Sequence, residues 1–269
     1  MKPSKNSNIL KTSINNNGIF KIVLDNSTNH NVLSEEMMQN LQFALDEAAS
    51  NNKIRVIIIS ANGSTFSAGH DLKELKKNRQ NTDKGKNYYK EIMLKCSKLM
   101  MSIVNNPKPV IAEVSGVATA AGCQLVASCD LSYASKSAKF ATPGVNIGLF
   151  CSTPMVALSR NVNKKDALKM LLTGDMINAD EAKRISLINE HVPENELTQS
   201  VMELATKISQ KSSITIKTGK QAFYQQYGMD LNDAYEFTSK TMTENALRDD
   251  AKEGINAFIE KRDPDWSDN

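Results

Sequence analysis

The alternation of hydrophobic and polar positions predicts strands and helices in turn along most of this chain. Short apolar runs bounded by turn residues are typical of strands. They fall at residues 9–13, 19–24, 55–60, 110–114, 131–134, 139–141 and 187–191. Apolar positions three and four apart are typical of helices. They follow Ser34 and Asn178, whose side chains suit the N-cap position, and recur at 87–105 and 121–128. The polar segment 78–86 and the segment 143–154, which is bounded by two prolines, are predicted to be loops.

After Pro193 only helices are predicted. They cover residues 197–211, 213–226, 231–246 and 249–260. The change suggests a strand-and-helix core over 1–195 and a C-terminal helical region over 196–269. We interpret the methionine and aromatic residues of this region as core or subunit interface rather than as a cofactor site. They are Met202, Phe223, Tyr224, Tyr227, Met229, Tyr235, Phe237 and Met242.

Two stretches rich in small residues each follow a predicted strand. The first, in PVIAEVSGVATAAGCQLVASCDL (109–131), leads from a strand through a small-residue turn into a helix. Unpaired N–H groups at such a helix start can hold an anion or the oxygen of an enolate. The alternative is an ordinary turn of an α/β domain. The second stretch, FSAGHDL (66–72), makes the first interpretation more attractive, because each turn then offers one N–H to the same oxygen.

The two stretches resemble the oxyanion hole of the crotonase (enoyl-CoA hydratase/isomerase) superfamily. The resemblance extends over nearly the whole chain and includes CD at 129–130, FATP at 140–143, LTGD at 172–175 and DEA at 180–182. It implies an α/β fold made of a spiral of β-β-α units, with a C-terminal helical part that packs against neighbouring subunits in a homotrimer or hexamer. It also implies an acyl-CoA ligand, in fatty-acid or acyl-CoA metabolism, whose carbonyl oxygen accepts from the N–H groups of His70 and Ala121.

Both glutamates of the family's two-glutamate hydratases are absent. One position lies three residues after the second N–H donor, and the other directly follows the proline of F-x-x-P. They are Gln124 and Gly144 here. An amide cannot take a proton from water near neutral pH, and glycine has no side chain. We therefore expect no efficient hydration of crotonyl-CoA by the two-glutamate route, and as a hypothesis the double change to glutamate restores it.

His70 is the best candidate for another proton-transfer group, because imidazole titrates near pH 6.5. The alternative is a ring that packs beside Asp71 or faces the coenzyme channel. Asn146 and Ser152 lie in the loop that forms the acyl pocket of relatives. They are expected to position a water molecule or to line that pocket. Cys151 has no identifiable base and suits an apolar lining role.

The resemblance also implies a coenzyme-binding loop. Its members here are Ala68, His70, Asp71, Leu72 and Lys73. Phe258 and Lys261 match C-terminal positions that approach the ligand of an adjacent subunit in relatives. No cofactor is expected other than the coenzyme A of the substrate, and the sequence has no metal-binding motif or dinucleotide fingerprint.

Composition adds limits. The formal charge is +3, from 33 basic and 30 acidic residues, with no dense basic run, so we expect no nucleic-acid partner. The four cysteines form no C-x-x-C pair, which favours reduced thiols. No apolar run is long enough for a membrane span. Residues 1–8 are expected to be frayed, and they are basic but short and lack arginine, so we expect no transit peptide and a cytoplasmic protein.

Three functions remain open. The first is an enzyme that polarises an acyl-CoA thioester and moves a proton with a group such as His70. The second is a non-catalytic acyl-CoA-binding pseudo-enzyme. The third is a structural or RNA-associated role, which the absence of a basic aromatic patch disfavours.

Overall fold

The computed structural model describes residues 9–268, so the expectation that residues 1–8 are frayed lies outside it. Its strands are β1 (Leu10–Ile14), β2 (Ile19–Leu24), β3 (Val56–Ala61), β4 (Thr65–Ser67), β5 (Val110–Val114), β6 (Val117–Thr119), β7 (Leu131–Ser135), β8 (Lys139–Ala141), β9 (Ile177–Asn178) and β10 (Glu190–Val192). Its α-helices are α1 (Glu35–Ser50), α2 (Leu72–Asn78), α3 (Lys86–Val104), α4 (Ala121–Ser128), α5 (Ser152–Asn161), α6 (Lys164–Thr173), α7 (Ala179–Arg184), α8 (Glu194–Ser209), α9 (Ser213–Gln226), α10 (Leu231–Ala246) and α11 (Asp249–Glu260). Two 3-10 helices, η1 (Ser27–Asn29) and η2 (Pro143–Ile147), complete them.

The strands form two sheets through a repeated β-β-α unit. The larger sheet has the order β1-β2-β3-β5-β7-β10 and the smaller one β4-β6-β8-β9. Each of β3, β5 and β7 belongs to the larger sheet and is followed directly by a strand of the smaller one, before the chain continues into helices. Neighbours pair in parallel except β1 with β2 and β8 with β9. This arrangement confirms the predicted α/β spiral of β-β-α units.

The larger sheet is covered on both faces, which explains why its central strands are apolar throughout. On β3, Ile57 and Ile59 join the main core, which also contains the buried faces of α1, α3 and α4. Val56 and Ile58 point the other way and pack with Leu197 and other residues of α8. Ser34 caps α1 as predicted, because its side-chain oxygen accepts from the N–H of Met37.

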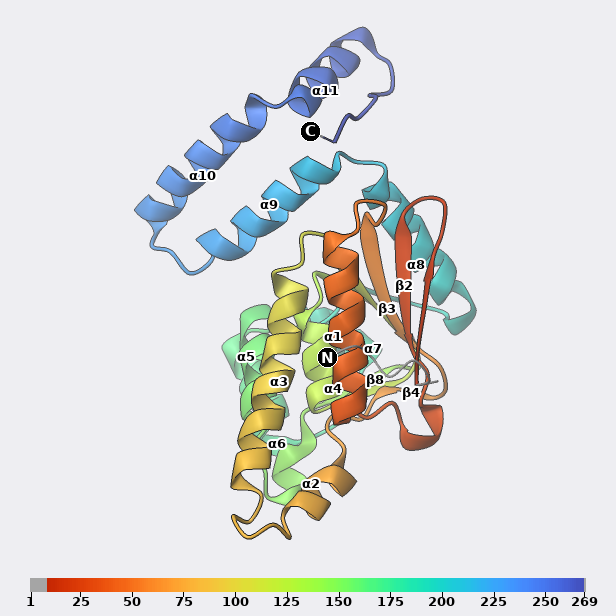
Figure 1. Ribbon diagram of the computed structural model, residues 1–269, viewed down its shortest axis with the longest axis vertical. Coiled ribbons are helices and arrows are strands. Elements are labelled where there is room, and N and C mark those ends of the chain that lie inside the picture. The colour runs from red at the N-terminus through yellow and green to blue at the C-terminus, as the bar shows by residue number, and fades with distance from the viewer. Residues whose placement is uncertain (1–8, 269) are drawn as a thin grey trace.

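The last three helices extend away from the sheets. Figure 1 shows α9 and α10 side by side as an arm beyond the upper end of the core, with α11 beyond the end of α10 and the C-terminal tail turning back toward the start of α9. The C-terminal tail packs against this arm. Arg55, just before β3, pairs with Asp268, and buried Asp250 of α11 accepts from the N–H of Ser267. The helical C-terminal region is therefore confirmed.

Several boundaries differ from the sequence expectations. The predicted loop 143–154 contains η2 and the first turn of α5, and α2 and α6 were missed. Pro154 suggested a loop, but it is the third residue of α5. The N–H groups of the first helical turn have no acceptor within the helix, so proline is tolerated there. The last strand, β10, is three residues long and begins at Glu190, later than the predicted start at residue 187.

Candidate active site

The turn before α4 meets the Gly69 loop, as the two small-residue stretches suggested. A Cβ on Gly122 would lie 2.1 Å from the carbonyl oxygen of Ser67, and one on Gly69 would lie 3.0 Å from the backbone nitrogen of Ala121. Only glycine permits backbones this close. All eight residues of α4 are buried, so the contact is deep in the core.

Ala120, directly before α4, has a φ of 51° and a ψ of −120°. This conformation is costly for a residue with a Cβ. It is held by two hydrogen bonds: the N–H of Ala120 donates to Ala141 over 2.9 Å, and its carbonyl accepts from the N–H of Gln124 over 3.0 Å. A strained residue that its neighbours hold firmly is typical of functional turns.

The backbone N–H groups of His70 and Ala121 flank this contact. Within residues 9–268 neither has a hydrogen-bond acceptor. The N–H of Ala121 is in the first turn of α4, where helix N–H groups have no partner in the helix itself and the dipole is positive. Two unoccupied donors at one corner are suited to hold one oxygen of a ligand.

The His70 ring lies at the same corner and is half-buried. Its Nε2 is shielded from solvent and has no hydrogen-bond partner in the described part of the chain. Burial lowers the pKa of His70 below its usual 6.5. The imidazole is therefore neutral at pH 7.

Gln124 and Gly144 occupy buried positions that offer no carboxylate. Gln124 is 4% exposed, and its Oε1 has one weak contact, 4.0 Å from Sγ of Cys96. A Cβ on Gly144 would lie 2.5 Å from the carbonyl oxygen of Leu149 and 2.9 Å from Sγ of Cys151. The chain has closed over the position where a glutamate side chain would begin. This packing argues against the hypothesis that two added glutamates restore hydration.

The four cysteines are free and buried, as the reduced-thiol expectation implies. Burial raises the pKa of Cys96 and of Cys123 to about 12 and also raises that of Cys151. A thiol that stays protonated is a poor nucleophile. Cys151 therefore fills space beside Gly144.

The predicted coenzyme loop contains the start of α2. Asp71 caps this helix by accepting from the N–H groups of Lys73 and Glu74, and its other oxygen accepts from Asn29 over 3.2 Å. Lys73 and Leu72 are exposed, whereas Ala68 is half-buried. The carboxylate of Asp71 thus has structural partners already, and the ammonium of exposed Lys73 donates to Oδ1 of Asn29 over 3.4 Å.

Four further predicted residues lie outside the corner. Asn146 is exposed in η2, and Ser152 is exposed at the start of α5, with its hydroxyl donating to Phe150. Phe258 is 85% exposed at the end of α11, and Lys261 follows it. In Figure 1, α11 lies at the far end of the arm from α4, so one chain does not bring Phe258 and Lys261 to His70.

Sequence reasoning missed two features near α4. Thr142 is 1% exposed, and its hydroxyl has no hydrogen-bond partner within the described residues. Lys220 of α9 reaches Asp130, just beyond α4, over 2.7 Å, and Tyr224 donates to the same carboxylate over 2.9 Å. The four-residue spacing of Lys220 and Tyr224 on a helix was a signal for this cluster. Asp130 therefore has a structural role, since its carboxylate also accepts from the N–H of Val110.

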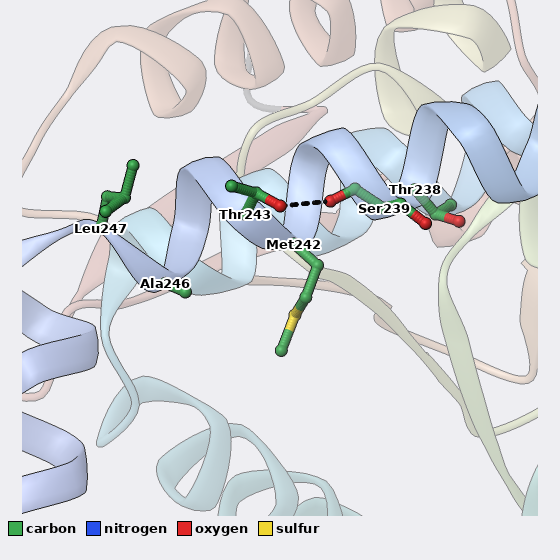
Figure 2. Close-up of a pocket in the computed structure, with 6 residues that line it drawn as sticks. All are labelled: Thr238, Ser239, Met242, Thr243, Ala246 and Leu247. Atoms are coloured by element: carbon green, nitrogen blue, oxygen red, sulfur yellow. Dashed lines mark hydrogen bonds between the residues drawn. The ribbon is translucent and has the colours of Figure 1, made fainter.

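A surface groove lies on α10, away from the corner. Figure 2 shows its lining residues along one side of the helix, with the Met242 side chain extending outward. The groove is lined by Thr238, Ser239, Met242, Thr243, Ala246 and Leu247. Its lining residues are apolar or carry a hydroxyl, and none of them is an acid or a base.

The two-sheet spiral and the helical arm define a crotonase-fold protein. The family described as "Enoyl-CoA hydratase/isomerase" matches residues 14–269, and the chain belongs to it. It is 50% identical over 250 residues to human "Enoyl-CoA hydratase domain-containing protein 3, mitochondrial", covering 93% of this chain and 81% of the relative. It is 32% identical to the "Short-chain-enoyl-CoA hydratase" of Clostridium acetobutylicum, over 86% of this chain and 87% of the relative.

Solved structures agree. The crystal structure of human enoyl-CoA hydratase domain-containing protein 3 superposes with a TM-score of 0.91 at 49% identity, covering 96% of this chain and 100% of that one. An enoyl-CoA hydratase from Mycobacterium smegmatis gives 0.92 at 41% identity, covering 97% and 99%. The predicted family resemblance is confirmed.

The expectation of a cytoplasmic protein is wrong. Five vertebrate relatives, 43–50% identical to this chain, are named as mitochondrial. The expectation rested on the few residues at the start of the sequence, which are a poor guide to compartment. In residues 9–268, the structure has no helix that is both long and apolar enough to cross a bilayer.

Proposed function

We propose that this protein binds an acyl-CoA thioester and stabilises its enolate between the N–H groups of His70 and Ala121. The observation that carries the proposal is the pair of acceptor-free amides at a strained, glycine-dependent corner. Such donors act on charge that develops in the transition state, and losing one typically costs about 10²–10³ in rate.

In this proposal the imidazole of His70 moves the proton. Its neutral Nε2 has a free lone pair when the proton is on Nδ1, and it takes the proton from the α-carbon while the electron pair moves onto the thioester oxygen. The same imidazolium returns a proton. The chemistry is therefore enolisation of isomerase or lyase type, and the two-glutamate hydration route is absent because Gln124 and Gly144 supply no carboxylate.

The second candidate is a protein that holds an acyl-CoA without converting it. The closed packing around Gly144 favours it, because that packing removes the space for one acid–base group. The amides and His70 are retained under both functions, so only a reaction test separates them.

The test is deuterium incorporation. The protein is incubated in heavy water with a panel of acyl-CoA thioesters, and their masses are followed. We expect deuterium at the α-carbon of a bound thioester, with exchange reduced about 10²–10⁴-fold in His70→Ala. Binding without any change of mass would favour the carrier. Failure to bind any member of the panel would overturn both.

The pH dependence of exchange tests His70 separately. The base is active when neutral, so exchange falls as the pH drops through the pKa of His70, and burial places that pKa below 6.5. A profile measured from pH 5 to pH 8 should therefore be flat near neutrality and decline only on the acid side. A rate that rises toward low pH would contradict a role for His70 as the base.

The double variant Gln124→Glu/Gly144→Glu is expected to leave crotonyl-CoA hydration absent. A Cβ at 144 forces the backbone at Leu149 to move, at a cost of about 1–3 kcal/mol or more in stability. The single variant Gln124→Glu is the control, since it adds no atom to the backbone contact. The melting temperature checks the loss of stability, and the absorbance of crotonyl-CoA follows its hydration. A stable double variant that hydrates crotonyl-CoA would show that the backbone at Leu149 moves to accept the new side chain.

We further propose that the arm assembles the protein into a homotrimer or a hexamer. We also propose that the protein acts in the mitochondrion, as the names of the relatives suggest. Large apolar side chains on the arm are exposed in a single chain, among them Leu231, Tyr235, Leu247, Phe258 and Ile259. Exposed apolar surface of this extent is typical of subunit contacts. Assembly would also bring Phe258 and Lys261 to a neighbour's ligand. A monomer in sedimentation at micromolar concentration would contradict it.

A further inference from the structure

The positive charge of this protein is concentrated in one short segment. Residues 73–90 contain seven basic and two acidic side chains, a net charge of +5, whereas the whole chain carries only +3 from 33 basic and 30 acidic residues. The rest of the chain is therefore negative, at −2. The basic residues of the segment are Lys73, Lys76, Lys77, Arg79, Lys84, Lys86 and Lys90. Charge gathered in this way on a nearly neutral chain is a sign of an interaction surface.

The segment folds into one compact unit, which we call the basic hairpin (residues 73–90). It comprises most of α2, a short loop and the start of α3, which lie together at the lower end of the molecule in Figure 1. The hydroxyl of Tyr88 donates to the carboxylate of Glu74 over 3.2 Å. That of Tyr89 donates to the carbonyl of Leu75 over 3.0 Å. Since α2 has seven residues, it is only about 10 Å long, close to the Debye length at physiological salt, so the fields of the cations add.

The cations of the basic hairpin are free to act on a partner. All seven are exposed, and none forms a salt bridge within residues 9–268. Lys73, Lys76 and Lys77 are three and four residues apart and therefore share one face of α2. Lys86 and Lys90 are related in the same way on α3. The hairpin therefore presents its positive charge to solvent.

The acids on or beside the basic hairpin are already held by other groups. They are Asp71, Glu74, Asp83 and Glu91, and their partners are the first N–H groups of α2, the hydroxyl of Tyr88, the N–H groups of Gly85 and Asn87, and the ammonium of Lys95, in that order. None of these carboxylates forms a salt bridge with a cation of the hairpin. The surface therefore keeps its positive potential.

The chemistry of the basic hairpin favours a diffuse anionic surface over a specific protein or nucleic acid. Six of its seven cations are lysine, which acts as a point charge, whereas arginine supplies the planar fork that suits specific recognition of carboxylates and phosphates. Protein partners and single-stranded nucleic acids also use exposed aromatic rings. Both tyrosines of the hairpin are half-buried, and their hydroxyls are already bonded. Anionic lipid headgroups need only positive charge spread over a surface.

The outer side of α3 continues this surface with apolar side chains. Lys90, Leu94, Lys98 and Met101 are all exposed, and their spacing of three and four residues places them along one side of the helix. Leu94 is 59% exposed and Met101 is 52% exposed. Such a mixture suits contact with a bilayer, because apolar side chains enter the headgroup region while the ammonium groups stay in water.

We infer that the basic hairpin and the adjoining side of α3 form a peripheral binding site for membranes that contain anionic phospholipids. The attraction is electrostatic, so the contact is reversible and weakens as salt screens the charges. Each lysine or arginine near an anionic leaflet typically increases the binding constant about 5-fold. The site does not depend on which reaction the corner at Ala120 catalyses.

The first experiment measures how much of the full-length protein sediments with lipid vesicles. Vesicles of phosphatidylcholine alone are compared with vesicles in which one third of the lipid is phosphatidylglycerol. At about 0.1 M salt we expect binding to the anionic vesicles to be at least about 10-fold tighter, and at about 1 M salt we expect release. Equal binding to both kinds of vesicle, or binding to neither, would overturn the inference. Tighter binding to single-stranded RNA than to anionic vesicles at the same salt would assign the surface to nucleic acid instead.

The second experiment tests the location of the site with two triple variants of equal net charge. Lys76→Gln/Lys77→Gln/Lys90→Gln should bind the anionic vesicles about 10²-fold more weakly. Lys53→Gln/Lys136→Gln/Lys207→Gln is the matched control, because it removes three exposed lysines from separate parts of the chain, and it should lose no more than about 3-fold. None of the six lysines forms a salt bridge within the described residues, so both variants should keep the melting temperature of the unchanged protein. Equal losses of binding in the two variants would show that total charge, rather than the basic hairpin, attracts the membrane, and would overturn the inference.

Discussion

Gly122→Ala should remove acyl-CoA binding and reduce the stability of the protein together. The new Cβ would lie 2.1 Å from the carbonyl oxygen of Ser67 and 2.8 Å from its carbonyl carbon, and neither backbone has room to yield in a helix that is buried along its whole length. Overpacking of a core typically costs about 1–3 kcal/mol, and a backbone-to-backbone clash should fall at or above the upper end. Separating the two stretches also separates the amides of His70 and Ala121.

Chemical denaturation measures the loss of stability, and ligand binding and deuterium exchange measure the loss of function. We expect a loss of about 3 kcal/mol in the free energy of unfolding and a loss of about 10²-fold or more in any enolisation rate. Gly148→Ala provides a matched control: its φ of 74° strains an alanine, but nothing lies within 4 Å of its Cβ, so no backbone is displaced. A Gly122→Ala protein that binds ligand normally would mean that the two turns do not form one site.

The second large effect concerns Lys220. Its side chain is 7% exposed, and the ammonium donates to the carboxylate of Asp130 at 2.7 Å and to the carbonyls of Ile103 and Lys108 at 3.0 Å each. Lys220→Met leaves Asp130 buried without its cation, and breaking one side of a buried pair typically costs about 3–5 kcal/mol. Denaturant unfolding of the variant measures this.

A double variant, Lys220→Met with Asp130→Asn, separates the loss of the pair from the burial of a lone charge. The double variant should recover part of the stability, because a buried pair contributes little net free energy once both charges are absent. Lys217→Met, on the same helix, is a control without these contacts and should change stability by less than about 0.5 kcal/mol. Equal losses in the single and double variants would contradict an unpaired charge as the cause.

The fold was largely predictable because strong periodicity marks its main elements. The apolar run at 110–114 and the helix at 121–128 have the predicted bounds in the structure. The short strands β4 and β6 were missed, since three residues inside a turn carry no measurable period. These strands are two of the four in the smaller sheet, and the meeting of the two turns depends on their pairing.

The candidate site was predictable in its backbone and not in its side chains. The Gly69 and Gly122 stretches predicted a close approach, because small residues let two backbones lie near each other. The missing partners of Thr142 and His70, and the closure of Leu149 and Cys151 over Gly144, depend on which atoms meet across segments far apart in the sequence. No local pattern contains that information.

The complete burial of α4 also determines how the molecule opens. The arm has few buried residues: α9 and α10 contain none, although the Lys220 side chain of α9 is shielded, whereas every residue of α4 is buried. Regions with little buried surface open locally at low free-energy cost, while core helices exchange their amide protons only on global unfolding. We therefore expect the part of the arm beyond the Lys220–Asp130 contact to open locally while the corner at Ala120 stays intact. Hydrogen exchange would show this as fast exchange across the arm and slow exchange in the interior turns of α4.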